Sequence, residues 1–285
     1  MAQLGTVLGR VGLWHRPPPP WRAGYVVAKD PPDEAPWRRA LAATGEPRAA
    51  DALAHAWDEL TAAERAAVLH PVTALGRDAR QATGRTCGPA VLTMLAAQGD
   101  PHLALWLASG RLVSPVRPPE LVGAPDEVLS RLRGLPARAR FAVLHRVVHH
   151  RATVRAVGGL AWPRALGTPP WALARSARYL GVRFGHTVVD DTDPRGLEAV
   201  LARVAAAIGA GIPVPLLTGG DTARGWSTAV PRHVVLAVGA RDGGLDVWEP
   251  ARGAVVRADA EALRGGRAHP AFGGWQHLTW VVLPR

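Results

Sequence analysis

The hydrophobic pattern of this 285-residue chain changes its period near Gly211, and that change limits the folds open to it. Before this point, apolar residues recur with the spacing of helices, whereas after it short apolar runs alternate with turns that mostly contain glycine. The strands predicted after this point are Ile212 to Leu217, His233 to Val238, Leu245 to Trp248, Ala254 to Arg257 and His277 to Leu283. One further strand, Val182 to Val189, is predicted among the helices. Helices followed by antiparallel strands predict an α+β fold.

The helical part contains one helix that is apolar on nearly all sides. Pro89 marks its start, since proline lacks the N–H that a first helical turn leaves unused. The residues that follow predict a buried helix that ends before Gly99 and packs across the sheet. Other helices are expected at residues 48–60, 61–70, 102–109, 126–133 and 137–151, at 168–181 with Thr168 as its N-cap, and from Asp193 onward. The second of these opens with Thr61-Ala-Ala-Glu64, the pattern of a capping box.

The only cysteine of the chain, Cys87, lies at the tip of that apolar helix. The positive end of a helix stabilises a thiolate, which is the reactive form of cysteine. We expect Gly84 and Gly88 to leave room for a substrate backbone beside the thiol. Gln81 offers an amide that could form an oxyanion hole together with the Cys87 N–H. A lone cysteine is more often a small buried hydrophobe, so the thiol alone does not decide between the two interpretations.

The segment Gln81-x5-Cys87-Gly-Pro-Ala, followed by an apolar helix, resembles the papain-like cysteine peptidases, most closely the bacteriocin-leader (double-glycine) peptidases. The resemblance implies that the glutamine serves the oxyanion hole, that the cysteine attacks, and that a histidine on a later strand and an acidic residue complete the site. His233 opens an apolar strand, and Glu249 stands just before Pro250 at the end of the next one. The family usually has Asp or Asn at the last position, so the longer Glu249 side chain would have to fold back.

The pairing of the two strands decides whether Glu249 can reach His233. The two residues lie directly opposite if the connecting loop runs from about Gly239 to Gly243. The local turn signal Asp242-Gly243 instead favours a two-residue loop, which would set Leu236 against Glu249 and turn the carboxylate away. We expect the longer loop, with the carboxylate within about 3.5 Å of a His233 ring nitrogen.

The resemblance implies a domain boundary and a reaction. The prolines and isolated charges at 15–47 predict little regular structure there, and residues 1–76 are interpreted as a Pro-rich arm and helical N-terminal extension. A papain-like domain would follow at 77–285, with a helical insertion at about 101–165. The expected reaction is acyl transfer through a Cys87 thioester, most simply hydrolysis of a bond in a peptide or protein substrate. Acyl transfer to an amine, deamidation, or a catalytically silent peptide-binding module of the same fold remain alternatives.

Two histidines on one predicted helix raise the question of a metal site. His145 and His149 are spaced to share a helix face, as metal ligands can be. No carboxylate completes a His-Glu-x-x-His pattern, and Arg146 and Arg151 lie beside them. We therefore expect a solvated helix face, no metal and no cofactor.

Composition narrows the partners. The formal charge is +11, but nearly all the basic residues are arginine, as a GC-rich genome would favour, and no basic run or nucleic-acid motif occurs. This disfavours a nucleic-acid partner. The single cysteine excludes an internal disulfide, and no apolar stretch reaches the ~18 residues of a membrane span. Residues 1–16 lack the apolar core of a signal peptide, so the expected location is the cytoplasm. The oligomeric state is left open.

Overall fold

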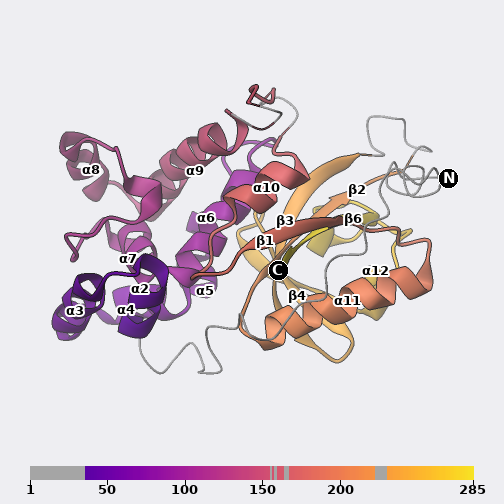
Figure 1. The fold of residues 1–285 in the computed structure, drawn as a ribbon, viewed down its shortest axis with the longest axis horizontal. Helices are drawn as coiled ribbons and strands as arrows, with labels where there is room; N and C mark the ends of the chain where they lie inside the picture. Colours follow the sequence, from indigo (N-terminus) through magenta and orange to yellow (C-terminus); the bar gives the residue numbers. More distant parts are fainter. Residues whose placement is uncertain (1–35, 155, 157–158, 164–166, 222–229) are drawn as a thin grey trace.

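The computed structural model describes residues 36–154, 156, 159–163, 167–221 and 230–285 (Figure 1). Its helices are α2 (Pro36–Thr44), α3 (Pro47–Ala56), α4 (Ala62–Leu69), α5 (Pro71–Leu75), α6 (Cys87–Gly99), α7 (Pro101–Ser109), α8 (Asp126–Arg133), α9 (Ala137–Thr153), α10 (Pro170–Ser176), α11 (Pro194–Gly209) and α12 (Ala260–Leu263). Its strands are β1 (Phe184–Val188), β2 (Val214–Gly219), β3 (Pro231–Arg241), β4 (Gly244–Glu249), β5 (Ala254–Ala258) and β6 (His277–Pro284). The predicted mixture of helices and strands is confirmed.

The six strands form one antiparallel sheet in the order β1-β6-β2-β3-β4-β5. Alternate strand residues point to opposite faces of the sheet. Both faces are apolar, and helices cover each of them. Val234, Leu236 and Trp248 join the apolar cluster that contains α6, while Val235 and Val247 join the cluster that contains α11. In Figure 1, α6 lies between the sheet and the other N-terminal helices. The predicted packing of α6 against the sheet is therefore confirmed.

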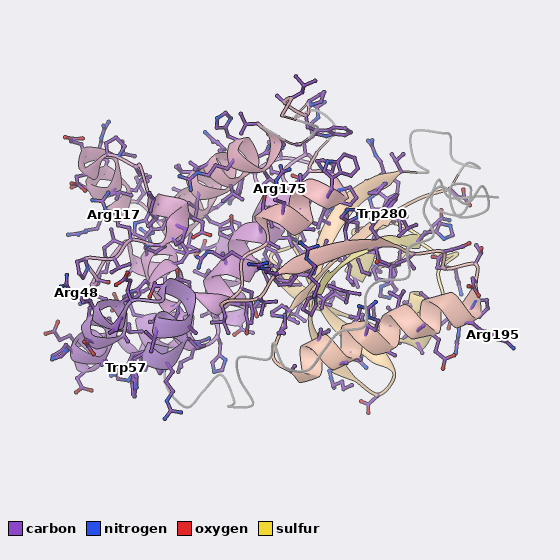
Figure 2. The ribbon with its side chains drawn as sticks, viewed as in Figure 1. Arg48, Trp57, Arg117, Arg175, Arg195 and Trp280 are labelled. Atoms are coloured by element: carbon purple, nitrogen blue, oxygen red, sulfur yellow. The ribbon has the colours of Figure 1, made fainter. Side chains whose placement is uncertain are left out.

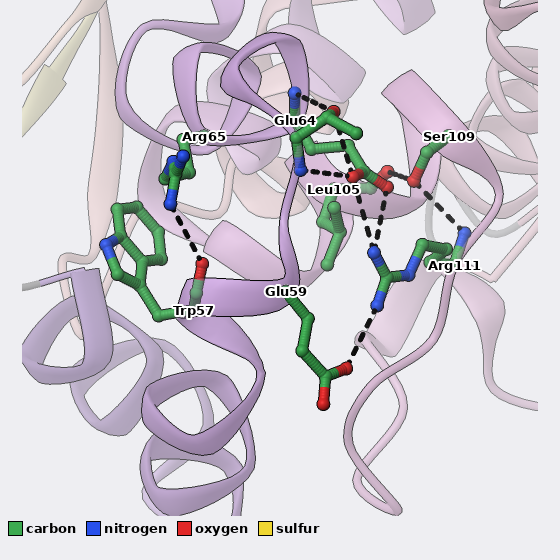
Figure 3. A network of polar contacts seen from close by, with 8 residues as sticks. Trp57, Glu59, Glu64, Arg65, Leu105, Ser109 and Arg111 are labelled. Carbon is green, nitrogen blue, oxygen red and sulfur yellow. Dashed lines mark hydrogen bonds and ion pairs between the residues drawn. The ribbon is translucent and has the colours of Figure 1, made fainter.

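The N-terminal helices pack around α7. The predicted capping box of α4 is present: the Thr61 N–H donates to Glu64 Oε2 at 2.9 Å, and the Glu64 N–H donates to Thr61 Oγ1 at 3.2 Å. Arg111, just after α7, approaches Glu64 at 3.3 Å and Glu59 at 3.8 Å (Figure 3). The first turn of α4 is thereby joined to the end of α7.

The predicted irregular arm at 15–47 falls mostly outside the described residues, and its last part was predicted wrongly. Pro36–Thr44 forms α2, because a proline in the first helical turn fits a helix rather than breaking it. Arg39 fastens α2 to the interior by donating to the carbonyl of Gln98 at 3.2 Å and that of Val68 at 2.6 Å. At least one charge of this segment, that of Arg39, therefore serves a folded helix.

The loop between β3 and β4 is shorter than we expected. Arg241 pairs with Gly244, so the hairpin loop holds only Asp242 and Gly243, whose φ angles are 46° and 68°. Two successive positive φ angles are those of the tight turn that Asp-Gly favours. The prediction of a loop from Gly239 to Gly243 is wrong, and the local turn signal was the correct guide.

A β-bulge nevertheless returns Glu249 to the sheet face on which the longer loop would have placed it. Val238 is an extra residue in β3, so Leu236 lies opposite Trp248 rather than opposite Glu249. This one-residue shift returns the side chain of Glu249 to the face of His233. The hairpin thus combines the tight turn with a bulge. Because Leu236 pairs with Trp248, Glu249 comes opposite Val235, so the prediction that it lies directly opposite His233 is wrong although the two side chains share a face.

His145 on α9 corrects another expectation. The residue is fully buried, and His149 is 7% exposed, so the prediction of a solvated helix face is wrong. Phe141 packs edge-on against the His145 ring with centroids 5.6 Å apart, and among the described residues neither ring nitrogen has a hydrogen-bond partner. Burial, followed by the charge of Arg146, lowers the pKa of His145 to about 4. The helix face turns inward because α9 packs against α6.

We expect His145 to make the fold sensitive to acid. In the unfolded chain the His145 ring is protonated below about pH 6.5, whereas in the folded chain it is protonated only below about pH 4. Stability is therefore fully present above pH 6.5 and is lost as the pH falls toward 4, by an amount on the order of 3 kcal/mol. Urea unfolding of wild type and His145→Leu at pH 7 and pH 4.5 measures this loss. The difference between the two pH values should shrink in the variant, and an equal loss in both proteins would contradict the assignment.

Candidate active site

Cys87 is the first residue of α6 and is 6% exposed. Burial by itself raises the pKa of its thiol. A hydrogen bond from His233 and the charge of that residue, with the backbone N–H groups of Val234 and Gly88, outweigh burial and hold the pKa of the thiol below its ordinary value. The surroundings of Cys87 therefore favour the thiolate.

His233 lies between the thiol and a carboxylate. Its Nε2 is 2.8 Å from Glu249 Oε1, which leaves Nδ1 for Cys87. Burial lowers the pKa of His233, but the hydrogen bonds and charges of Cys87 and Glu249 raise it to about 9. At neutral pH the imidazole is therefore protonated, and it lies between the Glu249 carboxylate and a thiol whose pKa is lowered. The distance to Glu249 meets the expectation of about 3.5 Å.

Glu249, the last residue of β4, is 1% exposed and turns back over the residues that follow it. The Ala251 N–H donates to Oε1 and the Arg252 N–H donates to Oε2, both at 2.9 Å. Burial raises the pKa of the carboxyl group, and the bonds from His233 and the backbone outweigh that effect and lower it. The side chain of Glu249, longer than the Asp or Asn usual in the family, therefore folds back as we expected, and its carboxyl group stays ionised.

The backbone of Gln81 is bonded to the turn that follows Glu249. Its N–H donates to the carbonyl of Pro250 at 2.9 Å, which joins the segment before α6 to the turn after Glu249. Its Oε1 is buried and finds no hydrogen-bond partner in the part of the chain that the structure describes. Among the described residues, no bond joins the Gln81 amide to Cys87. The structure thus brings Cys87, His233 and Glu249 into direct interaction and Gln81 to the adjoining turn.

The surroundings of the two glycines beside Cys87 differ from our expectation. Gly84 has open space where a side chain would lie, but a Cβ on Gly88 would be 2.9 Å from both Cβ and Oγ1 of Thr168. Thr168 is not the N-cap of α10, a place taken by Pro169, and α10 ends at Ser176 rather than near residue 181. The space at Gly88 is filled by Thr168, so only Gly84 can leave room for a ligand.

Gly273 is a site residue that the sequence analysis missed. Its φ is 66°, and a Cβ there would lie 2.3 Å from Cδ2 of His233. The Thr218 hydroxyl donates to the Phe272 carbonyl at 3.0 Å and holds this turn against the sheet. The adjacent pair Gly273-Gly274 was the available signal, since paired glycines mark a turn with positive φ angles.

Gly273→Ala should therefore displace the His233 ring. We expect alkylation of Cys87 by iodoacetamide at pH 6 to slow by about tenfold or more, because the thiolate loses its cationic partner. Gly274→Ala is the matched control: its φ of 84° brings similar backbone strain, but no atom of the described residues lies within 4 Å of the added Cβ. Equal alkylation rates in the two variants would show that contact with the ring is unimportant.

The described parts of the chain contain no cluster of three or more His, Cys, Asp or Glu side chains that could hold a metal. Within those same ranges, no helix is long and apolar enough to cross a membrane. Comparison with known proteins gives no match to a protein-family model, a curated protein or a solved structure. The proposal below therefore rests on the geometry of the site and on the sequence motifs.

Proposed function

We propose that this protein is a papain-like, cysteine-dependent acyl-transfer enzyme, most simply a peptidase that cleaves a peptide or isopeptide bond. The observation that carries the proposal is the placement of His233 between the Cys87 thiol and the Glu249 carboxylate, 2.8 Å from the latter. A nucleophile, a base and a group that orients the base form the arrangement that covalent catalysis requires.

The proposed chemistry follows from the charges of these groups. The Cys87 thiolate attacks the carbonyl carbon, and the negative oxygen accepts hydrogen bonds from the Cys87 N–H and the Gln81 amide. His233 donates its proton to the leaving amine as the C–N bond breaks, which leaves a thioester. The neutral imidazole then takes a proton from water, whose oxygen attacks the thioester and releases the carboxylic acid and the thiolate. Glu249 holds the ring and stabilises its charged form.

The raised pKa of His233 sets an upper pH limit in this scheme. Above about pH 9 the imidazolium is lost, so the leaving amine no longer receives its proton. Alkylation of Cys87 needs only the thiolate and would continue at such pH values. Above about pH 9 the rate of turnover would then fall while the rate of alkylation stays high. A thiol without an imidazolium partner would not show this difference.

A site of this kind could also transfer the acyl group to an amine, or deamidate glutamine, because these reactions share the thioester. We propose a peptide or protein as the acyl donor and the cytoplasm as the place of action. Helices α7 to α9 would be an insertion relative to a minimal peptidase, and the N-terminal helices an extension.

A catalytically silent peptide-binding module of the same fold is the second candidate. It is favoured by the low exposure of Cys87, which is 6%. Iodoacetamide separates the two candidates, since an active nucleophile reacts well below the pKa of ~8.5 of a free thiol. An inert Cys87 would support the silent module.

The direct test of the proposal is the mass of the intact protein after incubation with a peptide library. We expect a fraction of the protein to carry an acyl group that hydroxylamine removes, as it does from a thioester. Peptide mapping should place that group on Cys87. Hydrolysis, transamidation and deamidation are then distinguished by the mass of the released product. Cleavage without any dependence on Cys87 would exclude the proposal.

A further inference from the structure

Four exposed arginines border the candidate site. Each is close in the chain to one of the proposed functional residues: Arg80 precedes Gln81, Arg85 is two residues before Cys87, Arg232 precedes His233, and Arg252 is three residues after Glu249. Since successive Cα atoms are ~3.8 Å apart, every one of these side chains begins within about 12 Å of a site residue. We call these four residues the arginine rim.

Contacts place two members of the rim on the turn that follows Glu249. Arg80 Nε donates to the Ala251 carbonyl at 2.9 Å, which leaves its terminal N–H groups available. Arg252 Nε lies 3.7 Å from Glu249 Oε2, while 58% of the side chain stays exposed. The Arg252 guanidinium therefore lies beside the carboxylate of the site, and the Arg80 guanidinium lies against the turn that follows it.

The other two members lie near the thiol. Arg85 is exposed on the loop that leads into Cys87. Arg232 is exposed on β3 at an irregularity of the strand, where Pro231 pairs with Gly219 and His233 with Thr218, and it directly precedes the histidine that bonds the thiol. The rim therefore spans both the Cys87 side and the Glu249 side of the site.

Carboxylates do not balance this charge. Glu249 is buried and bonded to His233. Asp246 is held by Arg241 at 3.1 Å and by Arg257 at 3.3 Å, which leaves Asp78 as the one other carboxylate within three residues of a site residue. Among the described residues, Arg80, Arg85 and Arg232 form no ion pair.

We propose that the arginine rim binds carboxylate groups of an acidic peptide whose acyl group reaches Cys87. The inference rests on the proposed function and adds the class of substrate. A guanidinium fork matches a carboxylate with two parallel hydrogen bonds, and within the described residues only Arg252 of the four has an ion pair, with Glu249 at 3.7 Å. The short extent of the rim around a thiol–imidazole pair suits a few acidic side chains flanking the reacting bond better than a long polyanion.

The test uses two reagents that differ only in charge: acetyl-Glu-Glu-Gly-Gly chloromethyl ketone and its Gln-Gln counterpart. The thiolate of Cys87 attacks the methylene carbon, the C–Cl bond breaks and chloride leaves, so mass spectrometry gives the rate. We expect the Glu reagent to react about tenfold faster at low salt, because several exposed ion pairs each contribute a few-fold, and the ratio should fall in 0.5 M salt. The double variant Arg85→Gln/Arg232→Gln should reduce the ratio to about twofold.

A matched control removes the same charge elsewhere. Arg48 on α3 and Arg195 on α11 are exposed and lie toward opposite ends of the molecule (Figure 2). Arg48→Gln/Arg195→Gln should keep the wild-type ratio. Equal rates for the two reagents on wild type, or an unchanged ratio in Arg85→Gln/Arg232→Gln, would overturn the proposal.

Two further measurements separate the possible failures. If iodoacetamide finds Cys87 inert, the proposed function fails, and the inference is then judged by calorimetric binding of the Glu-Glu and Gln-Gln tetrapeptide amides to Cys87→Ala. Tighter binding of the Glu peptide that depends on Arg85 and Arg232 supports it. Binding of a 20-nucleotide single-stranded RNA that needs the same arginines, with no preference between the peptides, would assign the rim to nucleic acid and overturn it.

Discussion

Replacement of Cys87 by alanine is expected to lower kcat by roughly 10⁴-fold or more for any peptide that the wild-type protein turns over, because no other group can form the acyl intermediate. The fold should persist, since alanine is small and apolar like the buried thiol, and we expect a stability change of only about 1 kcal/mol. The measurement is product formation by mass spectrometry, with thermal unfolding of both proteins recorded in parallel.

Cys87→Ser is the control for this experiment. Its hydroxyl has nearly the shape of the thiol, but its far higher pKa keeps it protonated beside His233. We expect the serine variant to fold normally and to be almost as inactive as the alanine variant. Full activity in Cys87→Ala would exclude the proposed acyl transfer, however reactive the thiol proves to be.

His233→Ala is expected to raise the pH midpoint of Cys87 alkylation to the ~8.5 of a free thiol or above. In the wild type, the bond and charge of His233 outweigh the burial that would otherwise raise the pKa of the thiol. Removing the ring leaves burial without its main opposing effect. Iodoacetamide labelling from pH 5 to pH 10, followed by mass spectrometry, measures both midpoints.

A second buried histidine provides the comparison. His277 is 8% exposed and bonded to Asp191 at 3.0 Å, but it is not among the groups that act on the pKa of Cys87. His277→Gln should leave the alkylation midpoint where it is. An unchanged midpoint in His233→Ala, or an equal rise in both variants, would show that the thiol and the imidazole do not form an ion pair.

The choice of glutamate at position 249 has a geometric explanation. The carboxylate accepts two backbone N–H groups from its own turn as well as the His233 bond. A side chain one methylene longer than Asp can reach back over that turn and still present an oxygen to the ring. The departure from the usual family residue is therefore compatible with an orienting role.

The register of β3 and β4 shows why local signals could be read correctly and still mislead. Asp242-Gly243 marks the turn, but counting residues from that turn places Glu249 on the wrong face. Gly239 was the missed signal, since a glycine inside a strand often accompanies a bulge. A Cβ at Gly239 would lie 2.9 Å from the Asp246 carboxylate. Because glycine has no side chain, Asp246 has room there to pair with Arg241.

The sequence by itself determined the elements that carry the site: the helix that begins at Cys87, the strand that holds His233, and the strand that ends at Glu249. These follow from apolar periodicity, a proline in the first helical turn and glycine turns, all of which act within a few residues. The order of the elements, mainly helices first and antiparallel strands afterwards, was predictable for the same reason.

Only the tertiary structure decided how those elements meet. Four features depend on which distant segments come together. They are the bulge at Val238, the contact of Gly273 with His233, the position of Thr168 against Gly88 and the burial of His145. Periodicity shows that a residue lies on a helix or a strand, but not which neighbour covers it. That neighbour sets the burial and the nearby charges, and these determine the pKa values on which the proposed chemistry depends.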